Sequence, residues 1–151
     1  MLEDTQGDGI SKNSVMKVVL ACGVFDIFHY GHLLHLQAAR KLGDVLIVTV
    51  TADEAVNKGS GHPVFKLHQR MAVIRALAIV DDVRQHWKIE ETIAQLRPSI
   101  YTKGREYEGR LPEQELVESY GGRVVFTDDE VYSSTELLAG GYLKIPCLDG
   151  R

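Results

Sequence analysis

Residues 16–32 read MKVVLACGVFDIFHYGH, and the fold follows from this stretch. Residues 16–22 are apolar and rich in β-branched side chains, which predicts a buried strand. A helix is predicted over residues 31–42 from its helical spacing of apolar side chains, and Gly43 follows where a helix-ending glycine is common. A buried strand, a tight turn and a helix form the first unit of an alternating α/β chain.

The alternation continues along the rest of the chain. The further predicted strands are 45–51, 82–87 as an edge strand, 99–103 and 123–127. The further predicted helices are 52–57 as a short helix, 67–79, 89–96, 112–120 and 133–140. Such alternation forms parallel sheets covered on both faces by right-handed crossovers. The predicted fold class is therefore α/β, a single Rossmann-like, doubly wound parallel sheet of about five strands with helices on both faces.

Length, charge and cysteine content limit the possible classes of protein. The 151 residues suit one domain, expected over 16–138, after a mobile lead-in over 1–15 and before a tail over 139–151. A net charge of −4 argues against a nucleic-acid partner, and no apolar stretch approaches the about 20 residues needed to span a membrane. Two cysteines are too few for a disulfide framework. We expect a cytoplasmic protein without nucleic-acid or membrane partners.

Polar segments follow the predicted strands. GVFDIFHYGH (23–32) follows the first strand, KGREY (103–107) follows a later one, and SST (133–135) follows the loop after the last. In parallel α/β sheets, ligands bind beyond the carboxyl ends of the strands, where the strand order reverses. We therefore expect these three segments to meet on one rim of the sheet.

Two histidines flank Gly31 at the start of the first predicted helix. A helix N-terminus attracts anions, Gly31 lets a ligand approach the backbone closely, and His29 and His32 can donate hydrogen bonds to phosphate oxygens. Two other interpretations stay open at this point: ordinary helix-start residues, or ligands of a zinc ion. The remaining histidines have no cysteine or acidic partner at zinc-motif spacing, so no metal ligand is predicted. The chain also lacks G-x-G-x-x-G after this strand and any Walker A sequence, so any phosphate is bound by another device.

The stretch GVFDIFHYGH resembles the GxFDxxHxGH motif of the nucleotidyltransferase superfamily that includes the cytidylyltransferases and many adenylyltransferases. The resemblance implies that His29 and His32 contact a nucleoside triphosphate and stabilise the transition state. It also implies that a turn packs against the nucleotide, formed by Gly23, Val24, Phe25 and Asp26.

A second stretch, YSSTELL (132–138), resembles the Ser/Thr-rich turn that opens a helix in the same superfamily. It places Ser133, Ser134 and Thr135 where hydroxyl and backbone N–H groups would bind the β- and γ-phosphates. Plain helix capping is the ordinary alternative for these residues, and the two roles are compatible.

The middle of the chain is similar to the heptose-phosphate adenylyltransferases, the adenylyl-transferring half of ADP-heptose synthases. The similarity lies in KGSGHPVFKLHQRMAVIRALAIVDDV (58–83), TKGREY (102–107) and ELVESYGGRVVF (115–126). It implies that Lys58 holds the α-phosphate or the acceptor phosphate, and that Arg70 holds the leaving pyrophosphate. Lys103 and Gly104, at a strand end, would help form the nucleotide pocket. Solvated surface charges are the ordinary alternative for Lys58 and Arg70.

The resemblance implies a nucleotidyl transfer. A phosphate oxygen of a phosphorylated small molecule attacks the α-phosphorus of a nucleoside triphosphate in line, and pyrophosphate leaves without a covalent enzyme intermediate. Mg²⁺ would be carried by the triphosphate. The favoured donor is ATP and the favoured acceptor a sugar phosphate such as heptose 1-phosphate. A homodimer is expected from the resemblance alone.

Two alternatives remain beside this interpretation. Cytidylyltransferases that use CTP and glycerol 3-phosphate resemble the ends of the chain, but they carry an arginine before the Ser/Thr turn, where TDDEVYSST (127–135) is acidic. A non-catalytic nucleotide-binding module belongs to a different class, and the retention of every expected phosphate-binding residue argues against it. This chain also departs from the heptose enzymes, with Arg105-Glu106-Tyr107 in place of Gly-Asp-Tyr, which weakens the assignment of the sugar.

Overall fold

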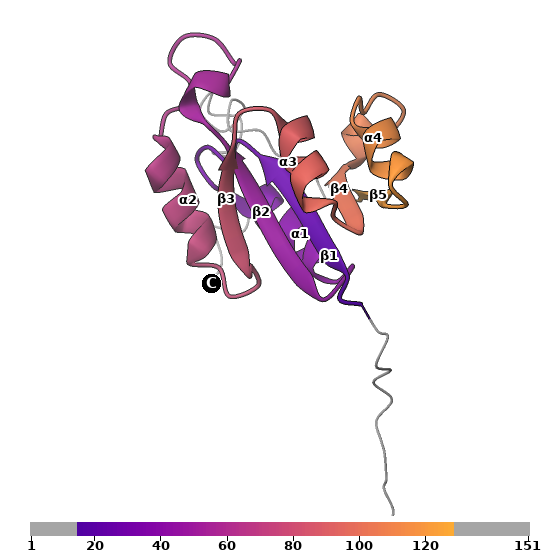
Figure 1. Cartoon of the computed structure of the whole chain (residues 1–151). Coiled ribbons are helices and arrows are strands. Elements are labelled where there is room, and N and C mark those ends of the chain that lie inside the picture. The colour runs from indigo at the N-terminus through magenta and orange to yellow at the C-terminus, as the bar shows by residue number, and fades with distance from the viewer. Residues whose placement is uncertain (1–14, 129–151) are drawn as a thin grey trace, which may run out of the picture.

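The computed structural model describes residues 15–128. Within them the predicted sheet is confirmed: five parallel strands lie in the order β3-β2-β1-β4-β5 (Figure 1). The strands are β1 Val18–Gly23, β2 Val45–Thr51, β3 Asp82–His86, β4 Ile100–Gly104 and β5 Arg123–Thr127. The predicted edge position of the 82–87 strand is confirmed, since β3 pairs with β2 alone among the described strands.

Four α-helices and two short 3₁₀ helices connect the described strands. The α-helices are α1 Tyr30–Arg40, α2 Leu67–Arg75, α3 Ile89–Leu96 and α4 Gln114–Ser119. The 3₁₀ helices are η1 Asp53–Ala55 and η2 Arg105–Tyr107. The prediction of a helix over 67–79 is too long, because α2 ends at Arg75 and the chain then continues through tight turns. No helix within residues 15–128 is long and apolar enough to cross a membrane.

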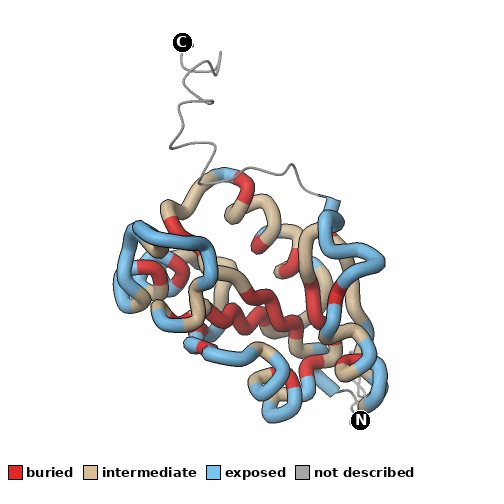
Figure 2. The backbone as a smooth tube through the Cα atoms, turned by 90° about the horizontal axis from the view of Figure 1, so that it is seen from above, coloured by how far each residue is buried: buried red, intermediate tan, exposed pale blue. Residues whose placement is uncertain are grey.

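Apolar cores lie on both faces of the sheet, as the doubly wound prediction requires. Along β1, Val19 and Ala21 face one core, whereas Leu20 and Cys22 face the other. Helices α1 and α2 complete the first core with Leu36, Ala39 and Ile74. Helices α3 and α4 complete the second core with Ile93 and Val117. The residues of β1 and β2 are mostly buried, and Figure 2 shows buried residues gathered in the middle of the described part of the chain.

The expected role of Gly43 is wrong. Helix α1 ends at Arg40 with Lys41 as its C-cap in the right-handed region, so Gly43 does not end the helix. A Cβ atom at Gly43 would lie 2.7 Å from the carbonyl oxygen of Lys17 and 2.8 Å from Cγ2 of Val19. Glycine is needed here because the connection from α1 to β2 passes close against the start of β1.

The strand order places a crevice beside β1. The chain runs from β1 outward to β2 and β3, and then returns to place β4 on the other edge of β1. Connections that lead away in opposite directions leave space beyond the carboxyl ends of β1 and β4.

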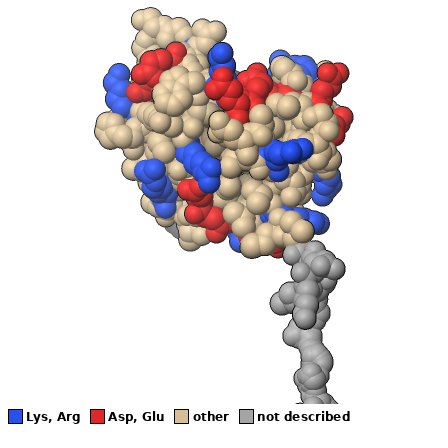
Figure 3. All heavy atoms as spheres, in the orientation of Figure 1, with Lys and Arg blue, Asp and Glu red and all other residues tan. Residues whose placement is uncertain are grey.

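On the face shown in Figure 3, basic and acidic side chains are interspersed over the surface of the described residues.

Candidate functional site

A pocket of about 540 Å³ lies beyond the carboxyl ends of β1, β2, β3 and β4 and beside the start of α1. Its lining includes these predicted site residues: Gly23, Val24, Phe25, Asp26, His29, Gly31, His32, Lys58, Lys103 and Gly104. The predicted residues Ser133, Ser134 and Thr135 lie outside the described residues. The first strand's turn and the KGREY segment thus meet on one rim, as the alternation of elements predicts.

The turn from β1 into α1 has an unusual backbone. Phe25 and Ile27 have φ angles of 51° and 49°, in the left-handed region that side chains other than glycine seldom adopt. Phe25 is nevertheless buried, and its ring packs edge-on against the ring of His32 with centroids 5.3 Å apart. The turn therefore directs an aromatic side chain into the core and brings the histidine pair to the start of the helix.

The two motif histidines cap α1 through their rings. His29 is the N-cap residue, and its Nδ1 accepts a hydrogen bond from the Gly31 N–H at 3.1 Å. Nδ1 of His32 accepts a hydrogen bond from the His29 N–H at 3.3 Å. Because each Nδ1 accepts a hydrogen bond, the neutral rings carry their protons on Nε2. Helix capping through Nδ1 is therefore compatible with a phosphate-binding role for the Nε2–H groups.

Burial and nearby positive charge keep both rings neutral. Burial, and after it the charges of His29, Lys58 and His35, together lower the pKa of His32 to about 3, against an opposing effect of Asp26. Burial and the charge of Lys58 also lower the pKa of His29. The rim therefore combines Nε2–H donors of neutral imidazoles with the fixed positive charge of Lys58, an arrangement suited to an anion.

A second cation lies on the β4 side of the pocket. Lys103 Nζ is 3.7 Å from Sγ of Cys22 and 4.3 Å from the ring centroid of Tyr107. Burial alone would lower the pKa of Lys103, but Cys22, Tyr107 and Glu113 outweigh it and raise that pKa. The ammonium group therefore stays charged, so the pocket has cationic side chains on both sides of β1.

Two pocket histidines were not predicted from the sequence. His86 ends β3, and its Nε2 lies 3.1 Å from Oγ1 of Thr51, which in turn donates a hydrogen bond to the Gly23 carbonyl. Burial, and after it the charge of Lys103, together lower the pKa of His86 to about 4, against an opposing effect of Glu90. His35, one turn beyond His32 on α1, contacts Thr127 at 2.8 Å. Their positions, at a strand end and on the motif helix, are signals that were available in the sequence.

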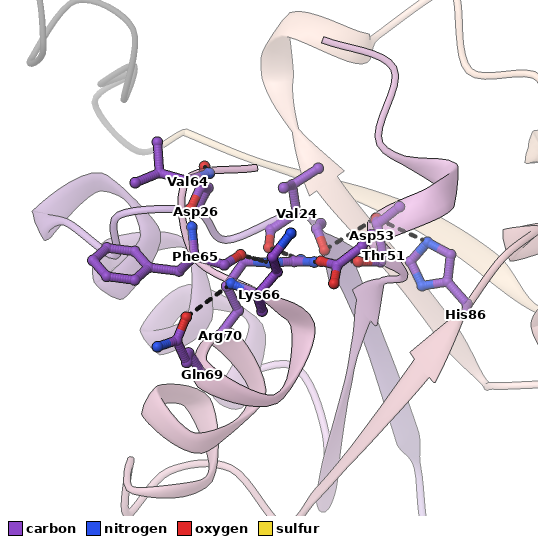
Figure 4. Close-up of polar contacts among 11 residues, drawn as sticks. Val24, Asp26, Thr51, Asp53, Val64, Phe65, Lys66, Gln69, Arg70 and His86 are labelled. Atoms are coloured by element: carbon purple, nitrogen blue, oxygen red, sulfur yellow. Dashed lines mark hydrogen bonds and ion pairs between the residues drawn. The ribbon is translucent and has the colours of Figure 1, made fainter. Parts of the chain in front are cut away.

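Arg70, which was predicted to hold the leaving pyrophosphate, lies outside the lining of the pocket. Arg70 is only 1% exposed. Figure 4 shows its guanidinium among other protein groups, where it donates hydrogen bonds to the carbonyls of Val24, Thr51 and Phe65 and to the carboxylate of Asp53. The guanidinium therefore bonds to groups of the protein itself. Sequence alone favoured an exposed or ligand-binding role because arginine is almost never fully buried without a partner.

No protein-held metal centre is evident in the described part of the chain. Between residues 15 and 128, no three or more His, Cys, Asp or Glu side chains are grouped so that they would hold a metal ion.

Comparisons with known proteins identify the family of the chain. The family model for cytidylyltransferase-like proteins matches residues 20–138. D-beta-D-heptose 1-phosphate adenylyltransferase of Bordetella bronchiseptica is 40% identical over 129 residues, which cover 82% of this chain and 80% of that protein. The bifunctional protein HldE of Streptomyces coelicolor is 45% identical over 130 residues, 81% of this chain, but the chain spans only 28% of its length.

A solved structure shows the same fold. The crystal structure of the lipopolysaccharide core biosynthesis protein from Thermoplasma volcanium superposes with a TM-score of 0.64 and 31% identity, covering 79% of this chain and all of that one. The resemblance carried by GVFDIFHYGH is thus confirmed over most of the chain. The chain belongs to the cytidylyltransferase-like family.

Proposed function

We propose that this protein transfers AMP from ATP to heptose 1-phosphate and releases pyrophosphate. The observation that carries the proposal is the anion-binding rim, where the capped pair His29 and His32 shares one pocket with Lys58 and Lys103. The choice of substrates is supported by the Bordetella relative, a D-beta-D-heptose 1-phosphate adenylyltransferase that matches 82% of this chain.

The proposed reaction needs positioning and charge stabilisation rather than a protein nucleophile. A phosphate oxygen of the sugar phosphate forms a bond to the α-phosphorus of ATP, the bond from that phosphorus to the α–β bridging oxygen breaks, and pyrophosphate leaves with the electron pair. The Nε2–H groups of His29 and His32 donate to phosphate oxygens as negative charge develops there. Lys58 supplies positive charge beside both rings, and the N-terminus of α1 adds its dipole.

Mg²⁺ is proposed to arrive as part of the substrate, bound to the triphosphate oxygens. Mg²⁺ keeps several water ligands and is commonly held by substrate phosphates with few protein ligands. The pocket is lined by residues from 22 to 113 and has lysine and histidine side chains beside Asp26, Glu106 and Glu113. Within the described residues, no three His, Cys, Asp or Glu side chains are grouped so that they would hold a metal ion. This composition suits a magnesium–triphosphate complex better than a free cation.

The first experiment measures pyrophosphate release with Mg²⁺, each of ATP, CTP, GTP and UTP, and either heptose 1-phosphate or glycerol 3-phosphate. The melting temperature is measured with each nucleotide alongside. The proposal predicts release with ATP that His32→Ala reduces about 100-fold, the usual effect of removing a transition-state donor. His68→Ala is the matched control, because His68 is an exposed histidine on α2 and should leave the rate unchanged.

Other outcomes identify the alternatives. Release with CTP and glycerol 3-phosphate instead would make the protein a cytidylyltransferase of an alcohol phosphate. A rise in the melting temperature with ATP, but equal background release by the wild type and His32→Ala, would make it a nucleotide-binding module without catalysis. Either result contradicts the proposed reaction.

The cellular setting is part of the proposal. We place the protein in the cytoplasm, where ATP is made and free cysteines such as Cys22 stay reduced. The homodimer expected from the resemblance stays a prediction, and light scattering of the purified protein tests it.

A further inference from the structure

The loop that carries Lys58 is joined to the β1 turn through Asp26. This aspartate is buried, and its two carboxylate oxygens accept hydrogen bonds from consecutive backbone amides. Oδ2 accepts from the Val64 N–H at 2.6 Å, and Oδ1 accepts from the Phe65 N–H at 3.0 Å. The aspartate of the GVFD turn thus fixes the end of the connection between η1 and α2, 38 residues further along the chain.

Arg70 fixes the same connection from the other side. Its Nε donates to the Phe65 carbonyl at 2.9 Å, so Phe65 is held through its N–H by Asp26 and through its C=O by Arg70. Nη1 donates to the carbonyls of Val24 at 2.8 Å and Thr51 at 2.9 Å. One guanidinium therefore joins the β1 turn, the end of β2 and the residues that lead into α2 (Figure 4).

The start of the connection is held by the same guanidinium. Arg70 Nη2 contacts Oδ1 of Asp53 at 2.7 Å, and Asp53 opens η1 directly after β2. Burial alone would raise the pKa of Asp53, but the hydrogen bonds from Arg70 and the Leu67 N–H lower it overall, so the carboxylate stays charged. A buried guanidinium needs such partners at its donors, and removing one partner of a buried pair is strongly destabilising.

Lys58 lies between these two fixed ends. Residues 58–61 are exposed, and Gly59 and Gly61 have φ angles of 87° and 83°. Within residues 58–62 the backbone forms a single hydrogen bond, from the His62 N–H to the Gly59 carbonyl at 3.3 Å. The position of Lys58 therefore depends on the anchors at Asp53 and Phe65 rather than on bonds inside the loop.

We propose that Asp26 and Arg70 are positioning residues that hold the loop of residues 54–63, and with it Lys58, beside His29 and His32. Lys58 lines the pocket together with both histidines in a structure without substrate, so the site is preorganised. The lowered pKa values of His29 and His32, to which Lys58 contributes, agree with this placement. The inference rests on the proposed function for its catalytic consequence, but not for the loop geometry itself.

The geometry is tested by hydrogen exchange in Asp26→Asn, which keeps the size of the side chain and removes its charge. We expect exchange of the hydrogen-bonded amides of this segment, which include Ala55, Val56, His62, Val64 and Phe65, to quicken about tenfold, the effect of weakening one charge-assisted hydrogen bond, while β1 and β2 keep their protection. Asp81→Asn is the matched control, because Asp81 also accepts a backbone N–H, from Leu46 at 2.8 Å, at the opposite rim of the sheet. Equal exchange of this loop in the wild type and both variants would overturn the inference, whether or not the protein transfers nucleotides.

The catalytic consequence is tested by a double-mutant cycle. If Asp26 acts by placing Lys58, Asp26→Asn lowers kcat/KM about tenfold in the wild type and by less than about twofold in Lys58→Ala. Additive losses in the cycle would overturn the positioning role, since Asp26 would then act independently of Lys58. Arg70→Lys keeps the positive charge but loses the several N–H donors of the guanidinium. Amide exchange in the loop should therefore quicken in Arg70→Lys as it does in Asp26→Asn. Exchange at the wild-type rate in Arg70→Lys would show that Arg70 does not hold the loop.

If the wild type releases no pyrophosphate with any nucleotide, the proposed function fails, and hydrogen exchange alone still decides the loop geometry. If Arg70→Lys does not fold, the Asp26→Asn variant decides between the outcomes. The two failures are therefore distinguishable.

Discussion

Nδ1 of His32 accepts a hydrogen bond from the backbone N–H of His29 at 3.3 Å, and the two imidazole rings stack with centroids 3.8 Å apart. The helix cap and the proposed phosphate site are therefore the same pair of side chains. In each ring Nδ1 accepts the cap hydrogen bond, and the proton of the neutral ring lies on Nε2.

The two roles of His29 should separate by substitution. Asn is a strong N-cap residue, so His29→Asn should keep the free energy of unfolding, whereas His29→Ala should lower it by about 1 kcal/mol. Both variants lose the Nε2–H donor, and kcat should fall about 100-fold in each. Urea unfolding and pyrophosphate release measure the two effects. A His29→Asn protein with full activity would show that the ring serves only as a cap.

Removing the charge of Lys58 should raise the pKa of both motif histidines. The positive charge of Lys58 disfavours the imidazolium forms of His29 and His32, and burial keeps their pKa values below 6.5 even without it. Proton NMR titration of Lys58→Met measures the change. Lys41→Met, at the far end of α1, is the control. An unchanged pKa of His32 in Lys58→Met would show that the Lys58 charge does not reach the ring.

His86 should make the protein less stable in weak acid. Its pKa is lowered from 6.5 to about 4 in the folded protein. Above pH 6.5 the His86 ring is neutral in both the folded and the unfolded protein, so it does not make the stability depend on pH. As the pH falls through 6.5 towards 4, the unfolded chain binds a proton that the folded protein does not, and the free energy of unfolding falls.

This acid effect is measured by urea unfolding at pH 7 and pH 5. His86→Gln should lose less stability between the two values than the wild type does. His68→Gln, an exposed histidine of α2, should keep the wild-type difference. An equal loss in His86→Gln and the wild type would contradict the prediction.

Gly43→Ala should destabilise the fold and leave the chemistry intact. The added Cβ would lie 2.7 Å from the Lys17 carbonyl oxygen, so the connection from α1 to β2 must shift away from β1. Overpacking of this kind costs about 1 to 3 kcal/mol. The residue lies at the amino ends of the strands, opposite the pocket, so kcat should be unchanged once the protein is folded. Stability equal to the wild type would show that the backbone yields there without strain.

The fold was predictable because its determinants are local. Apolar, β-branched runs and helical spacings alternate along the chain, and the order of elements follows from them. The ends of helices were less predictable. The apolar pattern of α2 continues past Arg75, but there the helix gives way to turns, in which the carbonyls of Ile74 and Leu77 accept backbone hydrogen bonds. The apolar spacing is the same in both conformations, so periodicity alone does not locate the end.

The site was predictable only where a motif is contiguous. His29 and His32 lie within one stretch of ten residues, and their placement on the pocket rim follows from it. The burial of Arg70 depends on carbonyls 5, 19 and 46 residues away. The contact of Lys103 with Cys22 spans 81 residues and arises from the pairing of β4 with β1. No local pattern encodes such partners.

The central place of β1 also has a consequence for synthesis of the chain. A ribosome completes β1, β2 and β3 before it makes β4, so the nascent chain has the edge of β1 that receives Ile100 and Thr102 still unpaired. An exposed apolar strand edge invites pairing with other chains. Docking of β4 closes that edge and, in the same step, brings Tyr101 and Lys103 beside Cys22. The outer edge of β4 is covered in turn only when β5 pairs with it, so the sheet is completed from the centre outward.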